Sequence, residues 1–76
     1  MKIDGKIVGS ELRSLRMKKR LSAEEVCDNV GIHINSLYKY EKDASLLKLE
    51  TLEKMLDYYG TDVFIFFKMI SEYNHD

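Results

Sequence analysis

LSAEEVCDNVGIHINSLYKYEKD, at residues 21–43, carries the clearest structural signals in this sequence. Ser22 and Glu25 have the spacing of a capping box, in which each side chain accepts a hydrogen bond from the other residue's backbone amide. A helix that begins here would end at Val30, because Gly31 readily adopts the positive φ that commonly follows a helix. The stretch therefore predicts two short helices joined by a tight turn at Gly31.

The second of these helices is expected at residues 34–42 and has two distinct faces. Ile34, Leu37 and Glu41 share one face, whereas polar side chains share another: Asn35, Tyr38, Lys39 and Lys42. Asparagine can form two hydrogen bonds with adenine and lysine can donate to guanine, so this polar face suits the edges of DNA bases. An ordinary solvated face has the same composition. The capped helix and tight turn before it nevertheless favour a helix-turn-helix that presents this face to DNA.

The sequence resembles the Cro and Xre-type repressor family of helix-turn-helix domains. Cys27, Gly31 and Leu37 match the small residue, the turn glycine and the aliphatic residue of the family motif. Upstream, GSELRSLRMKKRLS resembles the first helix of the family, and downstream LETLEKMLDYYGTDVFIFF resembles its fourth and fifth helices. The resemblance covers about residues 9 to 70. It implies a compact, all-α, five-helix domain like that of lambda repressor, with a central helix-turn-helix.

The resemblance also implies a buried ion pair between Arg16 of the first helix and Glu41 of the third. Both residues would serve the structure, because removing one partner of such a pair leaves the other charge uncompensated. Several positions depart from the family pattern, among them Ala23 and His33. Ala23 stands where a glutamine usually reaches a phosphate, and His33 stands where a serine or threonine usually caps the recognition helix.

The expected DNA contacts divide into base readers and phosphate contacts. Asn35, Tyr38 and Lys39 are the predicted base readers, and Ile34, at a position that often touches bases in the family, would meet a thymine methyl. The predicted phosphate contacts are Ser36, Lys42 and the amide end of the preceding helix at Ser22 and Ala23.

The net charge of the whole chain, −1, is low for a protein that binds nucleic acid. The charge is unevenly distributed, because residues 1–42 hold nine Lys and Arg against six Asp and Glu, and residues 43–76 hold three against seven. Lys18, Lys19 and Arg20 would flank a docked duplex while the acidic half faces away. The same basic cluster also suits the C-terminal dipole of the first helix.

Chain length and composition predict a single domain over residues 1–76. Seventy-six residues suffice for one core and not for two, and the sequence has no proline, repeat or low-complexity run. We expect an N-terminal element, a helical domain and a tail at residues 1–8, 9–70 and 71–76. The N-terminal MKIDGKIV could form a short β-hairpin around Asp4 and Gly5, or a frayed arm.

Two features predict a cytoplasmic protein without membrane association. The longest apolar run, VFIFF at residues 63–67, is far too short to cross a bilayer, and the N-terminus lacks the apolar region of a signal peptide. The single cysteine, Cys27, cannot form an internal disulfide, which agrees with a reducing compartment.

The C-terminal segment is more apolar than a monomer needs. If a fifth helix starts after Asp62, the inward positions are Val63, Phe66 and Phe67. Phe64 and Ile65 would then lie on the surface and suggest a homodimer interface. The alternative is a short strand that pairs across a dimer, since β-branched and aromatic residues suit a strand; we favour the helix. A twofold dimer would place two recognition helices at half-sites about 34 Å apart.

No catalytic or cofactor site stands out in the sequence. His33, His75 and Cys27 lack the spacing of zinc ligands, and there is no phosphate-binding glycine loop or nucleophile elbow. Glu24 and Glu25 suit the amino end of a helix rather than an acid–base pair. We therefore expect no enzyme activity, no metal and no cofactor.

Together, these features and the resemblance predict a sequence-specific DNA-binding transcriptional regulator of the repressor kind. It would act as a homodimer on a pseudo-palindromic operator in double-stranded DNA. The alternative is an antitoxin-like or regulatory module of the same fold that binds a protein partner through Phe64 and Ile65. The two functions differ in salt response, because phosphate contacts weaken steeply as the salt concentration rises.

Overall fold

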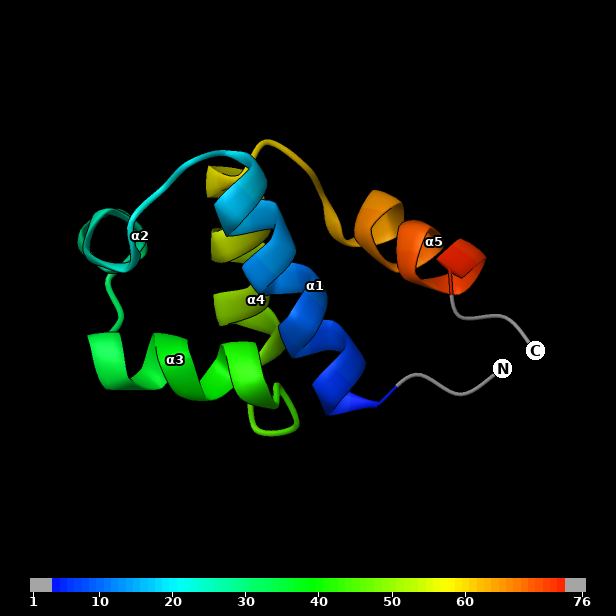
Figure 1. The fold of residues 1–76 in the computed structure, drawn as a ribbon, viewed down its shortest axis with the longest axis horizontal. Coiled ribbons are helices and arrows are strands. Elements are labelled where there is room, and N and C mark those ends of the chain that lie inside the picture. Colours follow the sequence, from blue (N-terminus) through cyan, green and yellow to red (C-terminus); the bar gives the residue numbers. More distant parts are fainter. Residues whose placement is uncertain (1–3, 74–76) are drawn as a thin grey trace.

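The computed structural model describes residues 4–73, which form five α-helices and, within that range, no strand (Figure 1). The helices are α1 (Gly5–Lys18), α2 (Ala23–Val30), α3 (Ile34–Lys42), α4 (Leu49–Tyr58) and α5 (Val63–Tyr73). The expected all-α, five-helix domain is therefore confirmed. No helix in the described range combines the length and the apolar character needed to span a membrane.

The expected N-terminal hairpin is wrong, because Asp4 caps a helix instead of starting a turn. Its Oδ1 atom accepts a hydrogen bond from the Ile7 amide at 2.9 Å, and α1 begins at the next residue, Gly5. Residues 1–3, the first half of the expected hairpin, lie outside the described residues. An Asp-Gly pair suits either a hairpin turn or a helix N-terminus. The helix places Val8 in the core, one turn before Leu12.

Local signals set the ends of most of the other helices. Ser22 and Glu25 form the expected capping box at the start of α2, and Gly31 follows the helix with a φ of 84°. His33 caps α3, because its Nδ1 atom accepts a hydrogen bond from the Asn35 amide at 3.2 Å. α4 begins after Lys48 without a side-chain cap, and in the loop before it the Ser45 amide donates a hydrogen bond to the Asp43 carboxylate at 2.9 Å.

α5 confirms the helical interpretation of the VFIFF segment. The Asp62 carboxylate accepts a hydrogen bond from the Ile65 amide at 2.9 Å and so caps the helix, as expected. Phe66 and Ile70, one turn apart, are fully buried. They join side chains from the other four helices in one core, whose fully buried members also include Leu12, Val26, Leu37, Met55 and Leu56.

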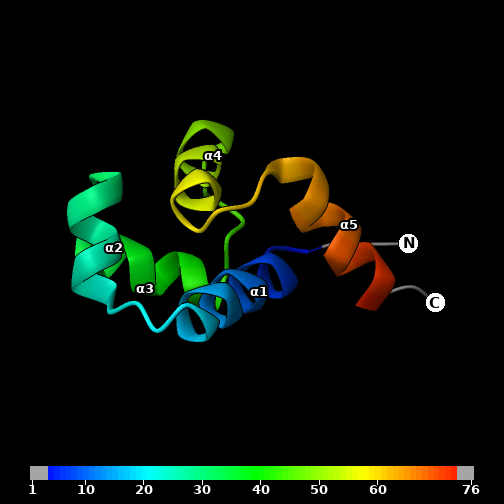
Figure 2. The same ribbon diagram turned by 90° about the horizontal axis from the view of Figure 1, so that it is seen from above.

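The helices are arranged so that the two ends of the molecule differ. α2 and the start of α3 lie at one end and α5 lies at the other, as both views show (Figures 1 and 2). α1 packs closely on α3, and α5 contacts α4 and α1 but not α3. A face presented by α3 is therefore separate from a face presented by α5.

Gly9 allows α1 to approach the backbone of α3. A Cβ atom at this position would lie 2.8 Å from the carbonyl oxygen of Glu41 and closer still to that of Tyr40. Both neighbours are backbone atoms, so they cannot rotate away as the end of a flexible side chain could. Any larger residue at position 9 must push α1 away from α3.

We expect Gly9→Ala to destabilise the domain, although the same change in a free helix would stabilise it by about 0.5–1 kcal/mol. Steric overlap in a packed interior costs about 1–3 kcal/mol, which exceeds that gain. Urea unfolding followed by circular dichroism measures the difference. Ser10→Ala, at the exposed neighbouring position, is the control. Equal stability of the two variants would show that the helices do not meet at Gly9.

Candidate nucleic-acid interface

α3 buries one face and exposes the other, as the sequence predicts. Leu37 and Glu41 are buried, whereas the polar side chains of the opposite face are exposed: Asn35, Tyr38, Lys39 and Lys42. Tyr38 retains 50% of its surface, so half of this residue is accessible to a partner. The helix thus presents amide, phenol and ammonium groups together.

A buried ion pair holds α3 against α1. The Nε and Nη2 atoms of Arg16 donate to the two carboxylate oxygens of Glu41 at 2.6 and 3.0 Å. The Nη1 atom donates to the Leu21 carbonyl at 3.1 Å, which ties the connection between α1 and α2 to the same guanidinium. The hydrogen bond that the guanidinium donates to Glu41 raises the pKa of Arg16, so the guanidinium stays charged. The ion pair expected between Arg16 and Glu41 is therefore present.

We expect Arg16→Ala to destabilise the domain by about 3–5 kcal/mol, because Glu41 would remain buried without a partner. A double variant with apolar residues of similar size, Arg16→Met with Glu41→Leu, should recover much of that loss, since no charge is then left buried. Thermal unfolding of the two variants and the wild type makes the comparison. If the double variant were no more stable than Arg16→Ala, unpaired charge would not be the cause.

Four of the predicted DNA contacts line one open groove. Asn35, Tyr38, Lys39 and Lys42 form its α3 side, Glu41 contributes to it, and Arg13 lines it from α1. Sequence reasoning assigned no role to Arg13. The available signal was its position three residues before Arg16 on the same helix, a spacing that directs both side chains toward one side of α1.

The structure places Ile34 and Ser36 differently from these four residues. Ile34 is half-buried and packs against the core, so only part of its side chain could meet a thymine methyl. Ser36 is also half-buried. Neither residue lines the groove.

The amino end of α2 offers fewer free donors than the sequence suggests. The Ser22 amide already donates to Glu25 Oε1 at 3.1 Å, and the Ser22 hydroxyl accepts from the Glu25 amide at 3.1 Å. The Ala23 side chain is buried. The donors that remain for a phosphate in the first helical turn are the backbone amides of Ala23 and Glu24. The positive end of the helix dipole attracts phosphate here, whereas the negative carboxylates of Glu24 and Glu25 repel it.

Cys27 lies in the core between α2 and its neighbours. Burial raises the pKa of its thiol, which lowers the fraction of reactive thiolate at neutral pH. Within residues 4–73, no three His, Cys, Asp or Glu side chains gather as metal ligands would.

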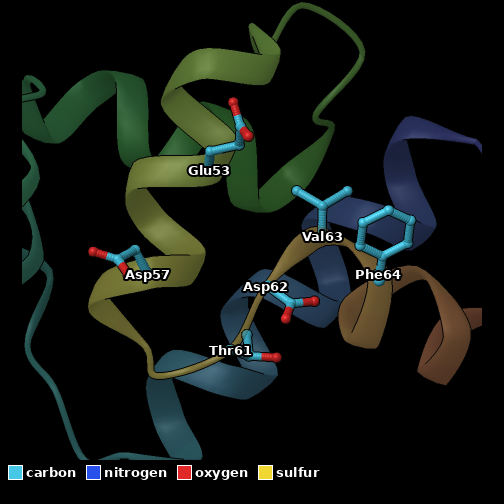
Figure 3. A pocket seen from close by; sticks show the side chains of 6 residues that line it. All are labelled: Glu53, Asp57, Thr61, Asp62, Val63 and Phe64. Atoms are coloured by element: carbon cyan, nitrogen blue, oxygen red, sulfur yellow. The ribbon is translucent and has the colours of Figure 1, made fainter.

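A second surface lies where α4 meets α5. Figure 3 shows side chains around an open pocket, with two from α4, two from the connection and two from the first turn of α5: Glu53, Asp57, Thr61, Asp62, Val63 and Phe64. Phe64 retains 87% of its surface and its neighbour Ile65 retains 51%. Exposed apolar groups therefore lie beside three carboxylates.

Comparison with other proteins agrees with this geometry. The cryptic phage CTXphi transcriptional repressor RstR of Vibrio cholerae is 39% identical over 54 residues, which are 71% of this chain and 49% of RstR. A putative HTH-type transcriptional regulatory protein of Sulfolobus acidocaldarius is 32% identical over 58 residues, which are 76% of this chain and 19% of that protein. The chain thus spans about half the length of the phage repressor and a fifth of the archaeal protein.

Solved structures share the fold at low sequence identity. A mutant of the restriction-modification controller protein C.Esp1396I superposes with a TM-score of 0.85 at 17% identity, covering 99% of this chain and 100% of the controller. The clp gene regulator ClgR from Corynebacterium glutamicum gives a TM-score of 0.84 at 18% identity, covering 95% of this chain and 77% of ClgR. A family model described as a helix-turn-helix domain matches residues 7–63. The chain belongs to the helix-turn-helix domain family.

Proposed function

We propose that this domain is a sequence-specific DNA-binding transcriptional regulator of the repressor kind. The observation that carries the proposal is the exposed face of α3, where Asn35, Tyr38, Lys39 and Lys42 gather on a helix held rigidly by a buried ion pair. The names of the relatives support it, since they include a transcriptional repressor and a putative transcriptional regulatory protein.

In the proposed complex, α3 lies in the major groove, which is wide enough to admit one α-helix. Asn35, Tyr38 and Lys39 meet base edges, and Lys42 meets a phosphate. Ser36 and the amino end of α2, at Ser22 and Ala23, give further phosphate contacts. Ile34 adds an apolar contact to a thymine methyl through the exposed part of its side chain.

A homodimer is the proposed active form. α3 is only nine residues long, so one domain can reach few base pairs, and a twofold dimer doubles the contacts on a pseudo-palindromic operator. Phe64 and Ile65 form the proposed interface, because they are the largest exposed apolar groups on α5. A dimer bound over a promoter would repress transcription by excluding RNA polymerase.

Selection from a random duplex library tests the function directly. The protein is incubated with the library at two salt concentrations, and its mass in solution is determined in parallel. Recovery of a palindrome, with weaker binding at the higher salt concentration, is the expected result. Weak binding without sequence preference would contradict the proposed regulator.

Two variants separate base reading from phosphate binding. Asn35→Ala should cost about 1–3 kcal/mol on the selected operator and relax discrimination at one base pair. Lys42→Ala should weaken binding to all duplexes similarly, because a phosphate contact carries no sequence information. Anisotropy titrations against the operator and single-base variants measure both effects. Unchanged discrimination in Asn35→Ala would show that α3 docks in another register.

The proposed interface is tested by Phe64→Glu. The wild type should have twice the chain mass of 8.9 kDa, and the variant should shift toward the monomer, because a carboxylate would be buried at the centre of the interface. Analytical ultracentrifugation gives the masses. Leu46→Glu is the matched control, since Leu46 is also exposed but lies between α3 and α4. A Phe64→Glu protein that dimerises like the wild type would place the interface elsewhere.

A protein-binding module is the second candidate function. It is favoured by the open pocket between α4 and α5, which is lined by Phe64 and by three acidic residues, a composition that suits a basic partner with apolar side chains. In this case the duplex library would yield no preferred sequence. Binding of the partner would be lost in Phe64→Glu and retained in Lys42→Ala.

A further inference from the structure

We propose that Arg13 on α1 is a DNA contact, and that it holds one backbone phosphate at the rim of the groove occupied by α3. This inference rests on the proposed function, because it adds a residue to the same interface. It gives α1 a second role beyond packing, because α1 would contact the DNA backbone while α3 lies in the major groove.

The position of Arg13 relative to α3 is set by close packing. Gly9 lies against the backbone of Tyr40 and Glu41, and Arg13 follows Gly9 by four residues, which places both on one side of α1. On the next turn, Arg16 is fixed to Glu41 by two hydrogen bonds. α1 is therefore attached to α3 both before and after Arg13 in the sequence. Arg13 lines the same groove as Tyr38 and Lys42.

The charges around the groove favour an anion. Arg13, Lys39 and Lys42 contribute three positive charges to its lining. The one carboxylate in the lining belongs to Glu41, whose two oxygens are already bound by Arg16. Within the described range, residues 4–73, Arg13 is exposed and makes neither an ion pair nor a side-chain hydrogen bond. Its five N–H donors are thus available to a phosphate, which guanidinium binds through two parallel hydrogen bonds.

Helix dimensions favour phosphate over base edges. The major groove is about 12 Å wide, and an α-helix with its side chains has a diameter of about 10–12 Å. Once α3 occupies the groove there is no room for α1 inside it. α1 must remain at the rim, where the sugar–phosphate backbone runs, and the Arg13 guanidinium reaches that backbone.

The experiment is a salt titration of Arg13→Gln against a matched charge variant. Lys54→Gln removes one positive charge from the exposed surface of α4, a helix that does not contact α3. Each protein is titrated by anisotropy with the selected operator and with a random duplex at several salt concentrations. Circular dichroism melts establish that both variants fold as the wild type does.

Loss of one phosphate contact has a defined signature. The slope of log K against log salt concentration should become shallower by about 0.9 in Arg13→Gln. The affinities for the operator and the random duplex should fall by a similar factor, because the contact is to the backbone. Arg13→Lys should retain the wild-type slope, since it retains the charge, and Lys54→Gln should also retain it.

Three outcomes would overturn the inference. If Arg13→Gln and Lys54→Gln have the same slope, Arg13 contributes only to overall charge, while the proposed function stands. If Arg13→Gln loses discrimination at one base pair with an unchanged slope, Arg13 reads a base instead of a phosphate. If the wild-type protein binds neither duplex, the proposed function itself fails, and the assignment of Arg13 fails with it.

Discussion

The bidentate ion pair between Arg16 and Glu41 is the interaction on which the rest of the structure depends. It links α1 to the C-terminal part of α3, and the third hydrogen bond of the guanidinium, to the Leu21 carbonyl, adds the connection to α2. Burying two charges costs desolvation energy, so the pair is favourable only because both carboxylate oxygens are bound and the geometry is good. Together with the close approach at Gly9 and the burial of Leu37, this ion pair sets the direction in which α3 presents its polar face.

The basic and acidic halves of the sequence contain different helices of the domain. α1, α2 and α3 lie in the basic half of the sequence, residues 1–42, and α4 and α5 lie in the acidic half. α5 lies at the far end of the molecule from α2 (Figure 1). An overall charge of −1 is therefore compatible with a DNA-binding face, because the negative potential of the acidic half would turn that half away from the duplex.

Short-range signals were readable where one local interaction decides the structure. The capping box at Ser22 and Glu25, the positive φ at Gly31 and the cap at Asp62 each involve residues within one helical turn. The same kind of signal was misleading at Asp4, because an Asp-Gly pair satisfies a turn and a helix cap equally well. The helix is favoured because it buries Val8 in the core. The Asp-Gly pair alone carries no information about this burial.

By itself, the sequence determined the positions of α2 and α3 and which face of α3 is polar, since periodicity and capping report these directly. The partnership of Arg16 and Glu41 came from family resemblance, because the two residues are 25 positions apart. Only the tertiary structure decided that Arg13 joins the α3 groove. It also decided that the Ser22 amide is occupied by Glu25. These facts depend on how far helices approach each other and on which donors are already used, and both are set by packing in three dimensions.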